Sequence, residues 1–321
     1  MKNILKNNFI IDASVELVPK ISISPFHEVF RSNNNTSSID ISENYFKQRF
    51  GNYKLFTKAR NAIYEVLLQF NLEKDDVVTI LTTSGNFYIS SCVTKEIDKI
   101  CKWSREFSEK TKVIFINHEF GYPMDEIDYK HVVEYKKSHP SVKIIEDCAH
   151  TFFSKSQVIG SHADYVIYSL PKSFAMQIGA VLVSQKYDLT KSLPVEYENY
   201  IISCFSNYVP KIGAYIDKQI QNYKYLKEQL QEIGITPFFN NASICKEATV
   251  PSVFLFKWKE DVDYPLLKEF MQSNGVESSV FYGENAFFIP SNYALSKDEL
   301  DYMISLLFCF NERYCLTGER K

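Results

Sequence analysis

The chain has 321 residues, a formal net charge of −3 and 45% hydrophobic residues, a composition that forms a folded core rather than a disordered chain. Its length suits one large domain or two unequal ones. Because no sustained basic stripe interrupts the mixed charges, the sequence does not predict binding to nucleic acid.

The N-terminal segment lacks the pattern of a targeting signal. Its apolar stretch is interrupted by Asp12, Glu16 and Lys20, and no small-residue cleavage site follows. No apolar run in the chain is long enough to cross a membrane, so no membrane partner is expected. The seven cysteines are widely spaced and form no C-x-x-C pair, which disfavours a disulfide framework or a zinc site. We therefore predict free thiols, no metal site and a cytoplasmic location.

Short apolar runs alternate with helical patterns from about residue 59 to residue 184. Apolar residues at helical spacing predict helices at 60–70, 89–103 and 125–137. Apolar, largely β-branched runs predict strands at 76–81, 113–117, 142–147, 164–169 and 179–184. This alternation is typical of an α/β protein with a mainly parallel sheet that is covered by helices on both faces.

The rhythm of the sequence changes near residue 190. Beyond that point we expect a long helix at 209–230, a strand at 253–258, a helix at 262–273 and a strand at 276–281. Ser296, followed by Glu299 at the capping-box position, predicts the start of another helix. These patterns indicate a large domain at 1–190 and a smaller C-terminal α+β domain at 191–321.

Two charged residues follow predicted strands of the first half. In open α/β sheets, ligands bind at the carboxyl ends of the strands. Asp147 ends one strand and could hold a cationic ring nitrogen, although a helix N-cap is the more common use of such an aspartate. Lys172 follows the next strand and could be desolvated, and so held as a neutral amine or an imine. A surface lysine in the turn after Pro171 is the alternative.

Two further segments could contact a ligand. Residues 57–62 (TKARNA) precede a helix and could present backbone N–H groups to a phosphate, although they contain no glycine and ordinary helix capping is the alternative. Residues 82–88 (TTSGNFY) follow a strand, and their hydroxyl and aromatic groups could flank a planar ligand. Core packing of the aromatic residues is the alternative there. Each of these signals is weak alone, but their order along the chain makes a ligand site more strongly predicted by all of them together.

In that order the sequence resembles the DegT/StrS-type nucleotide-sugar aminotransferases, which belong to the aspartate aminotransferase-like fold group. The resemblance rests on ARNAIYEVL (59–67), VIFINHEFGYPMD (113–125), IIEDCAH (144–150), IGSHADYVIYSLPKS (159–173), IGAVLVS (178–184) and FFIPSNYALSKDELDYM (287–303). It spans most of the chain and implies the fold of type I enzymes of pyridoxal 5'-phosphate (PLP). That fold has a three-layer large domain with a mainly parallel sheet and a smaller α+β domain.

The resemblance also implies PLP as the cofactor and assigns roles to three residues. Lys172 would bind the cofactor as an imine and later move a proton between substrate and cofactor. Asp147 would hold the protonated pyridine nitrogen, which keeps the ring an electron sink. His150 would touch the ring hydroxyl or the ring face.

Four more residues would complete the cofactor site in the same resemblance. Phe87 would stack on the ring, with Tyr88 as the competing residue. Ser169, Arg60 and Asn61 would bind the phosphate, the last two at a helix N-terminus.

The function implied by the resemblance is the transfer of an amino group from glutamate or glutamine to a keto-sugar, in the synthesis of surface polysaccharides or glycosides. A homodimer is implied as well, because the family builds its site at a subunit interface. The segment after Lys172 departs from the family pattern, since residues 176–180 contain only one glycine, Gly179. Two alternatives therefore stay open: a PLP enzyme of another reaction type, such as a dehydratase or a transaminase of a smaller ketone, and a relative without catalysis.

Overall fold

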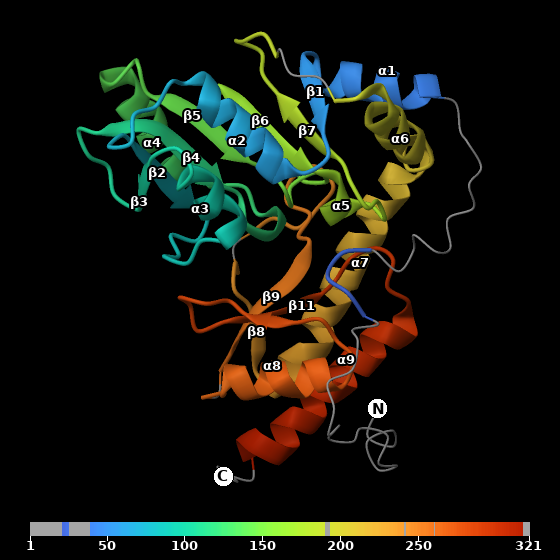
Figure 1. Ribbon diagram of the computed structural model, residues 1–321. Coiled ribbons are helices and arrows are strands. Elements are labelled where there is room, and N and C mark those ends of the chain that lie inside the picture. The colour runs from blue at the N-terminus through green and yellow to red at the C-terminus, as the bar shows by residue number, and fades with distance from the viewer. Residues whose placement is uncertain (1–20, 26–38, 190–192, 241, 260, 317–321) are drawn as a thin grey trace.

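A computed structural model describes residues 21–25, 39–189, 193–240, 242–259 and 261–316 (Figure 1). Residues 1–20, on which the prediction about a targeting signal was made, lie outside this part of the chain. Within the described residues, no helix has the length and apolar character needed to cross a membrane.

The larger of two sheets has seven strands in the order β1-β7-β6-β5-β4-β2-β3. Four neighbouring pairs are parallel, and only β7 runs against its two neighbours. The prediction of a mainly parallel sheet is thus confirmed, and the carboxyl ends of six strands lie at one edge. The strands are β1 (Tyr53–Phe56), β2 (Val77–Thr82), β3 (Lys102–Ser104), β4 (Thr111–Asn117), β5 (Lys143–Asp147), β6 (Tyr165–Ser169) and β7 (Ala180–Val183).

Helices cover both faces of this sheet, which gives three layers (Figure 1). Side chains alternate between the faces along each strand, as β4 shows: Phe115 packs with α2 and α3, whereas Ile114 packs with α1, α4 and α6. The layer under α1 and α6 is aromatic, with Phe46 stacked on Phe205 at 4.5 Å between ring centroids. The covering helices are α1 (Ile39–Phe50), α2 (Ala59–Gln69), α3 (Ser91–Ile97), α4 (Glu126–Ser138) and α6 (Val195–Ser206).

A second, four-stranded antiparallel sheet follows in the order β10-β11-β9-β8. The long helix α7 runs from the large sheet to this smaller sheet (Figure 1). The predicted capping box opens α9, since the Ser296 hydroxyl accepts from Glu299 N–H and the Glu299 carboxylate accepts from Ser296 N–H. The elements are α7 (Ile212–Leu230), β8 (Ile235–Pro237), β9 (Val253–Trp258), α8 (Tyr264–Ser273), β10 (Ser279–Val280), β11 (Phe287–Pro290) and α9 (Lys297–Phe310).

Three predicted elements differ from the structure. The helix predicted at 89–103 is only α3, because residues 102–104 leave it to pair with β2 as strand β3. The helix predicted from residue 209 begins at Ile212, after a 3₁₀ turn that contains Pro210. The strand predicted at 276–281 is reduced to the two residues of β10.

Contacts cross the boundary expected near residue 190. Ile21 pairs with Val276 and packs in the core of the smaller sheet. Ile201 and Phe205 of α6, which come after residue 190, pack in the core of the large sheet. The division of the chain into domains at 1–190 and 191–321 therefore stays a prediction.

Gly121 fixes the distance between the end of β4 and residues 250–252. Its φ is +90°, and a Cβ placed there would lie 2.6 Å from the carbonyl oxygen of Val250 and 3.1 Å from the Cα of Pro251. The hydrogen bond from Ser252 N–H to the carbonyl of Phe120, at 2.8 Å, joins the same two segments. A side chain at position 121 would therefore push the two segments apart.

We predict that Gly121→Ala lowers the free energy of unfolding more than Gly275→Ala does. Gly275 is a matched control, since its φ is +79° but nothing lies within 4 Å of a Cβ there. The left-handed backbone should cost each variant about 1 kcal/mol, and the clash should add about 2 kcal/mol in Gly121→Ala alone. Equilibrium urea denaturation measures both losses, and equal losses would contradict the prediction.

Candidate active site

A cavity of about 510 Å³ lies at the carboxyl edge of the large sheet. Its lining includes the last residues of β4, β5 and β6, which are Asn117, Asp147 and Ser169, and Thr57 directly after β1. The smaller sheet supplies another wall through Val280, Phe281, Tyr282 and other residues. The parallel topology thus collects polar side chains that are far apart in the sequence, as the strand-end rule predicts.

Lys172 lies on a one-turn helix, α5 (Leu170–Ser173), that follows β6 without a break. Leu170 N–H donates to the carbonyl of Gly179 at 3.0 Å, and Gly179 N–H donates to the carbonyl of Thr57 at 2.9 Å. These bonds hold the lysine turn beside the start of α2. The Lys172 side chain lines the cavity but is exposed, so the expectation of a desolvated lysine is wrong for the chain by itself. The reason is its place on the cavity wall rather than beneath packed side chains.

Asp147 ends β5 with a buried carboxylate that lines the cavity. A turn follows it rather than a helix, so the N-cap alternative is wrong, and the carboxylate instead accepts from Ala149 N–H at 3.0 Å. Burial raises the pKa of Asp147, and the Ala149 hydrogen bond and the charge of Lys172 oppose this rise. A buried carboxylate is stabilised by a hydrogen-bonded cation, so this site suits a ligand with a cationic N–H.

Glu146, the residue before Asp147, points away from the cavity into a buried polar network. Its Oε1 accepts from the Tyr129 hydroxyl at 2.7 Å, and its Oε2 accepts from Gly160 N–H at 2.9 Å. Successive residues of a strand face opposite sides of the sheet, which explains how adjacent acids serve different surroundings. The network fixes the end of β5 and therefore the position of Asp147.

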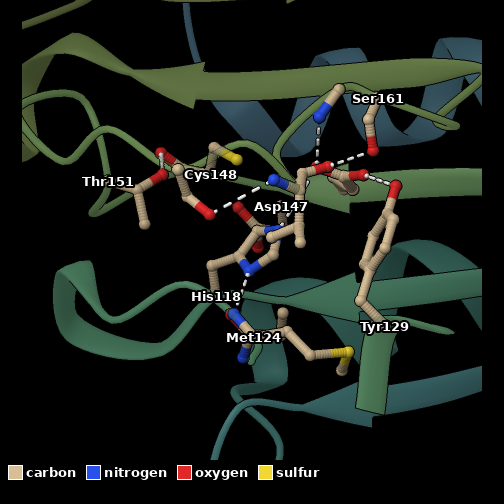
Figure 2. A network of polar contacts seen from close by, with 12 residues as sticks. His118, Met124, Tyr129, Asp147, Cys148, Thr151 and Ser161 are labelled. Atoms are coloured by element: carbon tan, nitrogen blue, oxygen red, sulfur yellow. Dashed lines mark hydrogen bonds and ion pairs between the residues drawn. The ribbon is translucent and has the colours of Figure 1, made fainter. Parts of the chain in front are cut away.

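His118, Glu146 and Cys148 place three possible metal-ligand atoms within 4.8 Å of one another. Met124 N–H donates to His118 Nδ1 at 3.0 Å, so the ring proton lies on Nε2, which faces Glu146 Oε2 at 3.3 Å (Figure 2). A protonated Nε2 has no lone pair for a metal ion. The cluster is therefore a hydrogen-bonded support for Asp147, whose carbonyl also accepts from His118 N–H at 3.1 Å.

His150 lies three residues beyond Asp147 and also lines the cavity. Its Nδ1 is 3.0 Å from the Ser252 hydroxyl, and its ring centroid is 5.7 Å from that of Phe120. Burial and, to a smaller extent, the charge of Lys172 lower the pKa of His150 to about 3. The imidazole is therefore neutral near pH 7 and can form hydrogen bonds without adding charge to a ligand.

The N-terminus of α2 reaches the cavity without a side-chain cap. Thr57, Lys58 and Arg60 line the cavity, and the N-cap residue Lys58 makes no capping hydrogen bond. The first N–H groups of a helix lack partners within the helix and attract anions. With two nearby cations and Ser169 in the same lining, this set of donors fits a phosphate dianion.

Two residues of the predicted site do not line the cavity. The Asn61 side chain is exposed and donates to the Thr57 hydroxyl at 3.1 Å. Phe87 is 74% exposed, and its neighbour Tyr88 lines the cavity. Of the two adjacent aromatic rings, only that of Tyr88 is placed to face a ligand in the cavity.

Several lining residues have no counterpart in the predicted site, and Glu119, Phe120 and Tyr282 are the main ones. Glu119 follows β4 as His150 follows β5, so the strand-end rule applied to residues 113–117 would have found it. Tyr282 lies in the loop between β10 and β11 and reaches the cavity from the smaller sheet.

The low pKa of His150 predicts a pH dependence of stability. Below pH 6.5 the unfolded chain binds a proton at this histidine, whereas the folded chain does not until about pH 3. As the pH is lowered through this window, the free energy of unfolding should therefore decrease, by at most about 1.4 kcal/mol per pH unit. Urea denaturation of the cofactor-free chain at pH 7 and 5.5 should show a smaller loss in His150→Asn than in the wild type. The exposed His131→Asn is the control, and an equal loss in all three proteins would refute the prediction.

A protein-family model described as "Putative PLP-dependent aminotransferase" matches residues 42–249, which is more than half of the chain. A search among curated proteins found no match. The donor set of the cavity fits the cofactor of this family: a phosphate site at α2, a buried carboxylate for a pyridinium N–H, and a lysine between them in the order of the strands.

Solved structures with the same fold include two aminotransferases and a protein with bound PMP. The sugar aminotransferase CalS13 from Micromonospora echinospora has a TM-score of 0.63 and 14% identity, over 93% of this chain and 99% of that one. A DegT DnrJ EryC1 StrS aminotransferase from Brucella abortus has a TM-score of 0.65 and 10% identity, over 89% and 94%. NtdA from Bacillus subtilis, with bound cofactor PMP, has a TM-score of 0.66 and 14% identity, over 90% and 81%.

These neighbours confirm the predicted type I fold of PLP enzymes, with a mostly parallel seven-stranded sheet. At such low identities the likeness concerns the fold alone. The match to the family model goes further, and it agrees with the residues that meet in the cavity. The chain therefore belongs to the family of PLP-dependent aminotransferases.

Proposed function

We propose that this chain moves an amino group from glutamate or glutamine to a keto-sugar, in nucleotide-linked form, during the synthesis of surface polysaccharides or glycosides. The supporting observation is the cavity that joins Lys172, Asp147 and the uncapped start of α2 at one edge of the sheet. The structural neighbour CalS13 is described as a sugar aminotransferase, which favours a sugar as the amino acceptor.

Lys172 and Asp147 would carry the chemistry. Bound PLP supplies an electron sink that stabilises negative charge on the substrate carbon. Lys172 would hold the cofactor covalently and, once released, move a proton to and from that carbon. Asp147 would accept a hydrogen bond from the pyridinium nitrogen, and its burial makes this charge-assisted bond strong.

The remaining cofactor contacts follow from the lining of the cavity. Ser169, Arg60 and the first N–H groups of α2 would bind the phosphate, and Lys58 would add a second positive charge. His150 would contact the ring as a neutral imidazole. Tyr88 lines the cavity and takes the stacking role in this proposal, in place of Phe87.

Replacing Lys172 tests the centre of the proposal. Lys172→Ala should lose the visible absorption band of the covalently bound cofactor, and its turnover should fall by at least about 10³-fold, because both attachment and proton transfer are removed. The control is Lys155→Ala, which changes an exposed lysine nearby in the sequence. A wild-type protein without bound PLP, or an unchanged band in Lys172→Ala, would reject the proposal.

The amino donor is tested on the same preparations. Glutamate or glutamine should convert the cofactor of the wild type to its amino form and remove the visible band. If neither amino acid does so in the cofactor-loaded protein, the proposed donor is wrong, even where PLP binding is retained.

A homodimer in the cytoplasm belongs to the same proposal. The six cysteines for which the structure gives a state are free thiols, as a reducing compartment would keep them. Helices α1 and α6 pack side by side (Figure 1). Both carry exposed apolar side chains, which a second copy could cover. They are Ile39, Ile41, Val195, Tyr197 and Tyr200.

Sedimentation tests the dimer and this surface together. At low micromolar concentration the wild type should sediment as a dimer, and the double variant Val195→Ser/Tyr197→Ser should shift toward the monomer by about tenfold or more in dissociation constant. Ile127→Ser is the control, because Ile127 is even more exposed but lies on α4. A monomeric wild type would contradict the dimer, and a control that dissociates as readily would contradict the location of the interface.

A further inference from the structure

Two acidic residues of the described chain line the cavity, and the proposed cofactor contacts use only Asp147. The other is Glu119, which follows β4 and is 6% exposed. Buried acids are rare unless they have a partner or a role.

One edge of the Glu119 carboxylate is already fixed. Ser84 donates twice to its Oε2, from the backbone N–H at 2.9 Å and from the hydroxyl at 2.6 Å. Within the described residues, Oε1 has no hydrogen-bond partner and Glu119 forms no ion pair. The carboxylate is thus held in one orientation with an acceptor oxygen left for a ligand.

Arg105, whose charge opposes the rise that burial causes in the pKa of Glu119, is engaged elsewhere. Its guanidinium donates to the carbonyl of Ile80, to the Thr82 hydroxyl at 3.0 Å and to the carbonyl of Asn86 at 2.7 Å. Arg105 therefore supports the loop after β2 rather than neutralising Glu119 through a direct contact.

The order of the strands places Glu119 on the side of the cavity away from the phosphate site. From β1 the sheet runs through β7, β6 and β5 to β4 and β2. The start of α2 follows β1, Lys172 follows β6, and Asp147 ends β5. Glu119 comes after β4, one strand beyond Asp147, so a cofactor that spans α2 and Asp147 leaves Glu119 for another molecule.

The turn that carries Glu119 is strained. Phe120, the next residue, has a φ of +50°, which is uncommon for a bulky side chain. Its ring contacts those of Phe281 and Phe288 from the smaller sheet, at 5.6 and 4.8 Å between centroids. Strain of this kind is concentrated at ligand sites, where surrounding contacts maintain it.

We propose that Glu119 selects the amino acceptor by accepting a hydrogen bond from a hydroxyl group of that substrate, and that it disfavours a carboxylate in the same place. The inference rests on the proposed function. An ionised carboxylate can only accept hydrogen bonds, so it matches a hydroxyl donor and repels a second carboxylate. The described cations that line the cavity are Arg60, Lys58 and Lys172, of which the first two are assigned to the phosphate and the third to the cofactor. None of them is left for a carboxylate placed beside Glu119, so the carboxylates of the amino donor would lie elsewhere in the cavity.

Three ring amines probe this selection in the PLP-loaded enzyme. Cyclohexylamine carries no hydroxyl group, and an aminocyclohexanepentol carries a hydroxyl group on each of the remaining ring carbons. The third probe, 2-aminocyclohexanecarboxylate, carries a carboxylate. Their equilibrium dissociation constants are measured at one pH by titration of the visible cofactor band and by calorimetry. The proteins are the wild type, Glu119→Gln, Glu119→Leu and the control Glu284→Gln. Burial raises the pKa of Glu119, and the charge of Glu284 adds to this rise, although Glu284 does not line the cavity.

The wild type should bind the pentol at least about tenfold more tightly than cyclohexylamine, as expected for a hydrogen bond to a charged group. Glu119→Leu should remove this preference, Glu119→Gln should reduce it, and both should bind the carboxylate probe about tenfold more tightly than the wild type does. Glu284→Gln should behave as the wild type. A wild type without preference for the pentol, a preference retained in Glu119→Leu, or an equal change in Glu284→Gln would overturn the inference.

Cofactor loading separates this result from a failure of the proposed function. The visible band and its loss on addition of glutamate or glutamine are recorded for every protein before titration. If the wild type binds no PLP or reacts with no donor, the proposed function fails. If it does both and Glu119→Leu still prefers the pentol, only the role of Glu119 fails. A normal band in the Glu119 variants shows that they are folded.

Discussion

The carboxylate of Asp147 is buried at the end of β5, and among the described residues it accepts one hydrogen bond, from Ala149 N–H. A charge in such a place is unfavourable unless a cation meets it, which makes the cofactor part of the electrostatic balance of the fold. The side chain of the adjacent Glu146 points to the opposite face of the sheet, so a second negative charge is kept away from the Asp147 carboxylate. On that face Tyr129, Gly160 and His118 satisfy Glu146. The positions of β4, α4 and the turn at residue 160 follow from this arrangement.

The reversed direction of β7 matters for the lysine. Because β7 runs against its neighbours, the chain enters this strand at the edge where the other strands end. Gly179, just before β7, therefore reaches the cavity and bonds to both Leu170 and Thr57. Its φ of +136° and the 3.0 Å from its Cβ position to Leu170 Cδ1 leave no room for a larger residue without a shift. Gly179 thus joins the turn that carries Lys172 to the start of α2, where the phosphate is proposed to bind. The family pattern has a glycine-rich stretch in this segment, and here a single glycine makes the connection.

Much of the fold and the centre of the site followed from the sequence, because hydrophobic runs fix the strands and parallel strands bring their ends together. Asp147, Lys172, His150, Ser169 and Arg60 meet in one cavity for this reason. Which of two adjacent side chains faces the cavity depends on the local direction of the backbone, and the sequence pattern does not specify that direction. Phe87 and Tyr88 are adjacent in the sequence, and one helical step of about 100° separates Arg60 from Asn61. The domain boundary is equally hidden, since α6 follows residue 190 but packs under the large sheet.

The two walls of the cavity come from separate parts of the chain, and one side chain fastens them together. The Asn86 amide donates to the carbonyl of Tyr282 at 2.6 Å, where Gly283 lies so close that a Cβ would be 2.1 Å from Asn86 Oδ1. The lysine and the phosphate site belong to the large sheet, whereas Phe281 and Tyr282 belong to the smaller one. Evolution can therefore vary the loop between β10 and β11 to admit new acceptors while leaving the reaction centre untouched. Relatives with different substrates should diverge fastest in that loop, yet keep a residue that ties it to the loop after β2.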